Sequence, residues 1–87
     1  MSIDQVKDAL EAIARDLRLG DREPEVELSR RWIHVVFTSD AFRGMTQGQR
    51  ENLVWREFER RLDDETILAI TQCYLLTPEE REEALAR

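Results

Sequence analysis

Two short segments with a two-residue period lie almost next to each other in the chain, and they constrain the fold more than any other feature. In residues 25–29, Val26 and Leu28 alternate with polar neighbours, and residues 32–38 (WIHVVFT) are rich in β-branched and aromatic side chains. Both patterns indicate β-strands. Because only two arginines separate the segments, we expect an antiparallel hairpin with one apolar face that other elements must cover.

The N-terminal segment is the first candidate for that cover. Apolar side chains recur every three or four residues from Ile3 to Leu17, which places them on one face of a helix. Ser2 and Gln5 have the spacing of a capping box, and Gly20 is the predicted end of the helix.

After the hairpin, the sequence predicts a short helical turn, a long helix, a strand and a last helix. The turn covers residues 39–44, and the helix covers 46–62. The strand is the apolar run 66–76 (TILAITQCYLL), and the last helix begins at Thr77-Pro78. Because a helix joins the second and third strands, we expect these two strands to run parallel.

These elements predict an α/β (α+β) fold in a single small domain, residues 1–87, with the order α-β-β-α(short)-α-β-α. A three-stranded sheet should carry helices mainly on one face. A chain of 87 residues buries a limited share of its surface, so a deep catalytic chamber is not expected.

Composition excludes several functions. The chain has 13 Lys and Arg against 19 Asp and Glu, a net charge of −6, whereas proteins that bind phosphate backbones are normally basic. One cysteine and one histidine are too few for a disulfide or a zinc ribbon, so no cofactor or metal is expected. No nucleophile–histidine motif or phosphate-binding loop is present, so the protein is not expected to be an enzyme. With no apolar stretch of membrane-spanning or signal-peptide type, we expect a cytoplasmic protein.

Residues 32–58 resemble the central segment of BolA-like proteins. In that family a strand ends in Ser-x-x-Phe-x-Gly, followed by a hydroxyl residue and a helix, which here are Ser39, Phe42, Gly44 and Thr46. The family's last strand commonly leads into Thr-Pro-Glu-Glu, and residues 77–80 match it. The resemblance implies a BolA-like fold, similar to the KH type II fold.

The same resemblance implies a monothiol glutaredoxin as partner and a role in iron–sulfur cluster handling. Family members of that kind use a histidine early in the last strand, where this chain has Leu68 or Ala69. The second ligand, from the loop between the first strands, would fall on residues 29–31, which are Ser-Arg-Arg. The family also has a histidine in the helix that follows its Ser-x-x-Phe-x-Gly motif, and this chain has Glu51 at that position. We therefore expect a divergent member that does not ligate a cluster.

The face of the hairpin opposite Ile33 is the candidate partner-binding surface. Trp32, His34 and Val36 lie on it by alternation, and the third strand adds alternating residues. Cys73 is included as a candidate, with the alternative that it is a small buried hydrophobe. This surface predicts a small protein-binding or regulatory module, unless the last helix or a second copy in a homodimer covers it.

A KH-like nucleic-acid-binding transcriptional regulator is the alternative function. Its candidate residues are Gly44, Gly48, Arg50 and Arg56, in a glycine-containing segment followed by a helix with several arginines. The glycines are separated by three residues instead of the two of a KH loop, and glutamates alternate with the arginines. These departures and the negative charge make nucleic acid the less expected partner.

Overall fold

The computed structural model describes residues 1–20 and 22–85. Eight elements follow one another: α1 (Ile3–Asp16), β1 (Glu25–Ser29), β2 (Trp32–Thr38), the 3-10 helix η1 (Asp40–Phe42), α2 (Gln47–Arg61), α3 (Asp64–Ala69), β3 (Ile70–Leu76) and α4 (Pro78–Leu85). The α/β fold with a three-stranded sheet is confirmed. No helix in the described ranges has the length and apolarity that crossing a membrane requires.

The three strands form a mixed sheet in the order β1-β2-β3, so β2 is central and β3 lies at an edge. β1 pairs antiparallel with β2, and Ser29 lies opposite Trp32, which leaves a two-residue connection in the hairpin. β3 pairs parallel with β2, as a helical crossover requires. Both strand directions agree with the sequence-based expectation.

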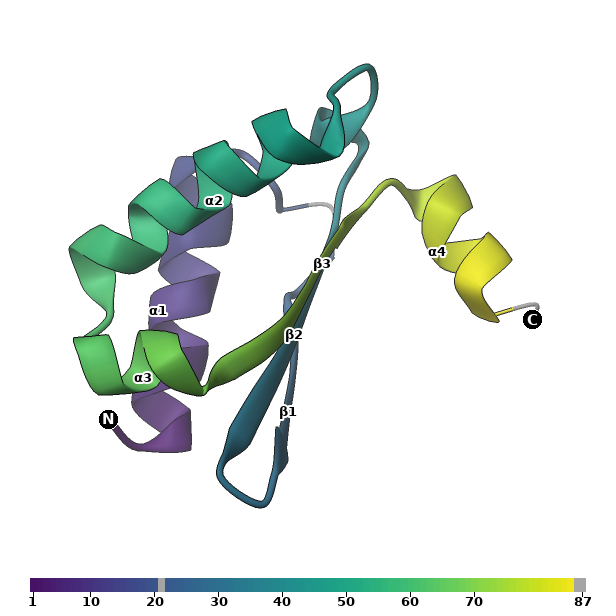
Figure 1. Cartoon of the computed structure of the whole chain (residues 1–87). Coiled ribbons are helices and arrows are strands. Elements are labelled where there is room, and N and C mark those ends of the chain that lie inside the picture. The colour runs from purple at the N-terminus through teal and green to yellow at the C-terminus, as the bar shows by residue number, and fades with distance from the viewer. Residues whose placement is uncertain (21, 86–87) are drawn as a thin grey trace.

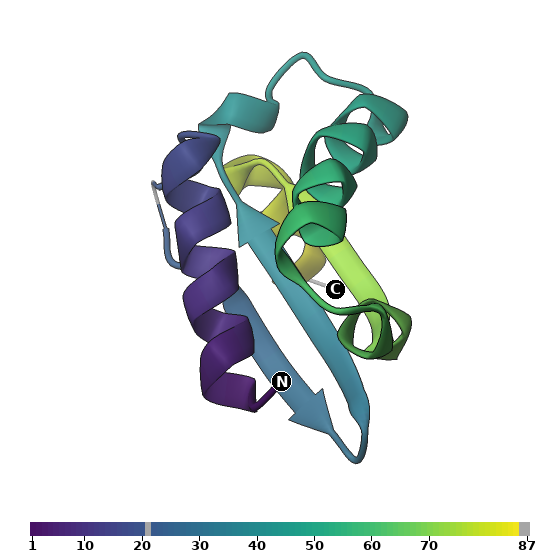
Figure 2. The same ribbon diagram turned by 90° about the vertical axis from the view of Figure 1, so that its left-hand side faces the viewer.

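Helices α1, α2 and α3 lie on one face of the sheet, and α4 lies on the other side (Figure 1, where the sheet is seen nearly edge-on). Turned by 90°, α1 and α2 run in front of the strands, with α4 behind them (Figure 2). The core fills the space between the helix layer and the sheet, and its members include Val6, Leu10, Ile13, Val35, Phe37, Val54 and Phe58, all at most 1% exposed.

The predicted third strand is wrong over its first residues. Residues 66–69 belong to helix α3, and β3 starts only at Ile70. The Asp63 side chain accepts a hydrogen bond from the Thr66 backbone N–H at 2.7 Å and so caps the helix. An acidic first turn also favours a helix through its dipole. This short helix leaves Leu68 78% exposed.

The first helix also differs from the prediction at its end. α1 stops at Asp16, before the predicted end at Gly20, and Arg18 adopts a φ of 58°, in the left-handed region. The capping box at its start is present as predicted, because the side chains of Ser2 and Gln5 each accept a hydrogen bond from the other residue's backbone N–H.

Candidate functional site

The open face of the sheet is the candidate site, defined as the face that points away from α1 and α2. Side chains of residues paired across neighbouring strands lie on the same face. On β2 this face carries Trp32, His34 and Val36, of which the last two are half-buried and Trp32 is exposed. The pairing adds Glu25, Glu27, Gln72 and Tyr74 from the neighbouring strands.

Aromatic side chains make part of this face apolar. Trp32 is 41% exposed, and Tyr74 is 50% exposed. Tyr74 lies opposite Val36, so the apolar surface continues from β3 onto β2. The Arg31 guanidinium lies 5.2 Å from the centre of the Trp32 ring, a distance typical of a cation–π contact. Exposed apolar surface with polar neighbours often marks a protein interface.

Beside this surface lies a groove of about 380 Å³, lined by Glu25, Val26, Glu27, His34, Val36 and Arg81. Arg81 comes from α4 and contacts β1 across the open face. Its Nε and Nη2 donate to the two carboxylate oxygens of Glu25, at 3.0 and 2.6 Å. The groove therefore has two carboxylates from β1 on one side and an imidazole and a valine from β2 on the other, and one arginine already occupies part of it.

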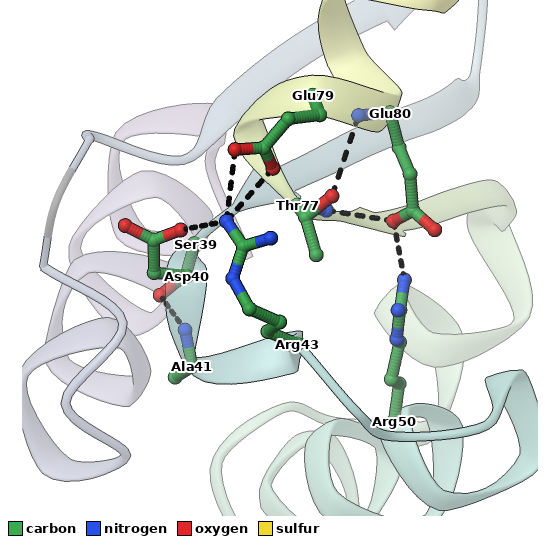
Figure 3. Close-up of polar contacts among 8 residues, drawn as sticks. All are labelled: Ser39, Asp40, Ala41, Arg43, Arg50, Thr77, Glu79 and Glu80. Carbon is green, nitrogen blue, oxygen red and sulfur yellow. Dashed lines mark hydrogen bonds and ion pairs between the residues drawn. The ribbon is translucent and has the colours of Figure 1, made fainter.

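The N-terminal end of α4 is held by a network of polar contacts (Figure 3). Arg43 donates to Asp40 and to both carboxylate oxygens of Glu79. The hydrogen bond from Arg43 lowers the pKa of Glu79 below its ordinary value. Thr77 and Glu80 form a capping box, in which the Thr77 N–H donates to Glu80 Oε1 at 2.8 Å and the Glu80 N–H donates to the Thr77 hydroxyl.

Arg50 is the buried member of this network. Its guanidinium donates to the Met45 carbonyl at 3.2 Å, to the Leu75 carbonyl at 2.8 Å and to Glu80 at 2.7 Å. The hydrogen bond from Arg50 lowers the pKa of Glu80. Its side chain is only 6% exposed. This arginine joins α2, β3 and α4, and it is not presented to solvent as a phosphate ligand would be.

The other residues of the nucleic-acid alternative do not gather into one loop. Gly44 has a φ of 81° in the turn before Thr46, a conformation that favours glycine. Gly48 lies inside the first turn of α2 instead of in a loop, and Arg56 is exposed further along that helix. The structure therefore separates the two glycines by a helix start and places the arginines in different environments.

Cys73 does not lie with the other candidate partner-binding residues. It pairs with Val35, whose side chain points into the core, so the thiol lies on the helix-covered side of the sheet. His34 is on the opposite face, and the two side chains cannot ligate one ion. Among the described residues, no group of three or more His, Cys, Asp or Glu side chains is placed to hold a metal ion.

The Cys73 thiol is expected to react slowly in the folded protein. Burial, with a smaller contribution from the Glu51 carboxylate, raises the pKa of Cys73 to about 12. Only the thiolate attacks disulfide reagents, so labelling at pH 8 should be at least ~100-fold slower than in the urea-unfolded chain. A stopped-flow absorbance assay with an aromatic disulfide measures both rates, and equal rates would contradict the buried placement.

Sequence reasoning missed the acidic side of the groove and Arg81. Glu25 and Glu27 alternate with the inward-facing residues of β1, and this pattern already places their carboxylates on the open face. No sequence pattern connects Arg81 with Glu25, because the two are 56 residues apart. The chain matches no family model, no curated protein and no solved structure.

Proposed function

We propose that this chain is a small, non-enzymatic protein-binding module of regulatory type that binds its partner with the open face of its sheet. The observation that carries the proposal is the exposure of Trp32 and Tyr74 on the sheet face opposite α1 and α2. Tyrosine and tryptophan are enriched at protein interfaces because they bury a large area with few rotatable bonds.

Charge defines the kind of partner. Glu25 and Glu27 border the apolar surface, and the whole chain carries a net charge of −6. Opposite charges at an interface speed association and disfavour wrong partners. The complementary surface therefore combines apolar side chains, which cover Val36 and Tyr74, with basic side chains beside β1. Like charges repel, so a second copy of this chain, with its own net charge of −6, is disfavoured as the occupant.

The proposal includes a BolA-like scaffold, and the motif residues support it through their structural roles. The Ser39 hydroxyl accepts a hydrogen bond from the Ala41 N–H at 3.1 Å and so caps η1. Phe42 is fully buried, and Gly44 makes the left-handed turn before α2. A monothiol glutaredoxin is the partner that this resemblance suggests, bound without a cluster ligand because Leu68 and Ala69 have no ligating side-chain atom.

Capture from an extract of the native cell, with matched variants, tests this function. The tagged chain should retain a partner that the double variant Trp32→Ser, Tyr74→Ser retains at least ~10-fold less, since aromatic anchors carry much of an interface's energy. Leu68→Ser is the control, because it also removes an exposed apolar side chain but from α3.

Nuclease treatment of the extract separates a protein partner from nucleic acid. Retention that survives the nuclease and depends on Trp32 and Tyr74 supports the proposal. Retention that both variants lose equally, or that disappears with the nuclease, would contradict it.

A further inference from the structure

We propose that the acidic groove on the open face binds an arginine side chain of the partner, and that Arg81 occupies this place in the free protein. The inference rests on the proposed use of the open face for binding. It adds the chemistry of the contact and a competition within the chain. The occupant is an extended, arginine-containing segment of a protein.

The contact between Arg81 and Glu25 has the geometry of arginine recognition. Two guanidinium nitrogens donate to the two oxygens of one carboxylate, at 3.0 and 2.6 Å. This fork requires a planar guanidinium, and a lysine ammonium cannot reproduce it. The structure thus contains an example of the ligand that the groove can bind.

A second carboxylate in the groove is still available for a ligand. Glu27 follows Glu25 on the same face of β1, and it has no ion-pair or hydrogen-bond partner among the described residues. Glu27 lies directly opposite His34 on β2. An incoming guanidinium at this position would lie between a carboxylate and an imidazole ring, and arginine stacks well on such a planar ring.

The Arg81 side chain can leave Glu25 at little cost. None of the residues of α4 is buried, so its position depends on polar contacts. The contacts at its start hold the helix independently of Arg81, because they use Arg43 and Arg50. Glu25 is half exposed, and ion pairs at such sites contribute little to stability. A partner's arginine can therefore replace the Arg81 side chain at Glu25 while the backbone of α4 stays in place.

The chemistry of the segment follows from the layout of the groove. An extended peptide places alternate side chains on one face, with a spacing that matches the strands beneath. With the peptide backbone above the line between β1 and β2, the arginines on one side would reach Glu25 and Glu27, and the apolar side chains that alternate with them would reach Val36 and Tyr74 on the other side. The expected ligand is a strand-like segment in which arginine and apolar residues lie close together.

A synthetic peptide tests the inference directly. The probe is acetyl-Val-Arg-Val-Arg-Val-amide, titrated into the isotope-labelled full chain, with chemical shifts of His34 and Val36 as the readout. Arg81→Ala should bind the probe about two- to fivefold tighter, since the competing ion pair with the half-exposed Glu25 is removed. Glu25→Gln with Glu27→Gln should bind it at least ~5-fold more weakly. The same peptide with citrulline in place of arginine should not bind.

Arg60→Ala is the matched control. It also removes one positive charge, but from an exposed arginine on α2 that pairs with Glu57. If Arg60→Ala tightens binding as much as Arg81→Ala does, the effect is general electrostatics and the competition is overturned. Shifts that do not include His34 and Val36, equal binding of the citrulline peptide, or no binding at all would overturn the groove assignment. The proposed function is decided separately, by the capture experiment with Trp32 and Tyr74.

Discussion

Replacing Phe58 by alanine is expected to lower the free energy of unfolding by about 4 kcal/mol, within the range for buried phenylalanines. Phe58 is fully buried in the middle of the core. Its ring lies 6.4 Å from the centre of the Phe37 ring on β2 and 4.8 Å from that of Trp55 on α2. The truncation would therefore remove the contact that joins α2 to the central strand and leave a cavity between them.

Urea unfolding followed by tryptophan fluorescence measures this loss. Phe58→Leu is the control, because it keeps most of the side-chain volume and should lower the free energy of unfolding by less than ~1.5 kcal/mol. The free energy of unfolding of a small domain is about 5–15 kcal/mol in total. The alanine variant should therefore unfold at a clearly lower urea concentration, with an unchanged dependence of the free energy on urea. A loss below that of the leucine variant would contradict the placement of Phe58 in the core.

The strands and helix starts were predictable because their causes are local. The alternation in residues 25–29 and 32–38 requires only that one face of the hairpin be buried, and the observed strands have the same bounds. The capping boxes at Ser2 and Thr46 each need a hydroxyl and a glutamine three residues apart. The parallel direction of β3 followed from the helix between it and β2.

The boundary between α3 and β3 was mispredicted because residues 67–70 (ILAI), which span it, are all apolar. A uniform apolar run has neither the two-residue nor the 3.6-residue period, so it cannot distinguish strand from helix. The one sequence feature that indicated a helix here was Asp63, a good N-cap residue followed by two acidic residues. Residues 63–65, between the predicted helix and the predicted strand, contain the start of helix α3.

The site was predictable only in part because half of it depends on long-range contacts. Alternation alone placed Trp32, His34 and Val36 on one face, and the structure agrees. It could not show that Cys73 lies on the other face, since that depends on the register between β2 and β3, where Val35 is its partner. The crossing of α4 to bring Arg81 beside Glu25 is likewise a property of the folded chain.

The two arginines of the nucleic-acid alternative are expected to differ sharply in their effect on stability. Arg50→Ala should lower the free energy of unfolding by about 3 kcal/mol, because two backbone carbonyls and a carboxylate lose a buried donor. Its guanidinium carbon also lies 5.7 Å from the centre of the Phe42 ring. Arg56→Ala, at an exposed position of the same helix, should change the free energy by less than ~0.5 kcal/mol.

Urea denaturation of both variants checks this contrast, and Arg50→Lys separates charge from geometry. Lysine keeps the positive charge but cannot donate in three directions from a planar group, so most of the loss should persist. Equal stability of the Arg50 and Arg56 variants would show that the buried network contributes nothing. Because charge reversal at Arg50 would also unfold the domain, a loss of nucleic-acid binding in that variant would be ambiguous. Arg56→Glu is the variant that tests nucleic-acid binding without disturbing the fold.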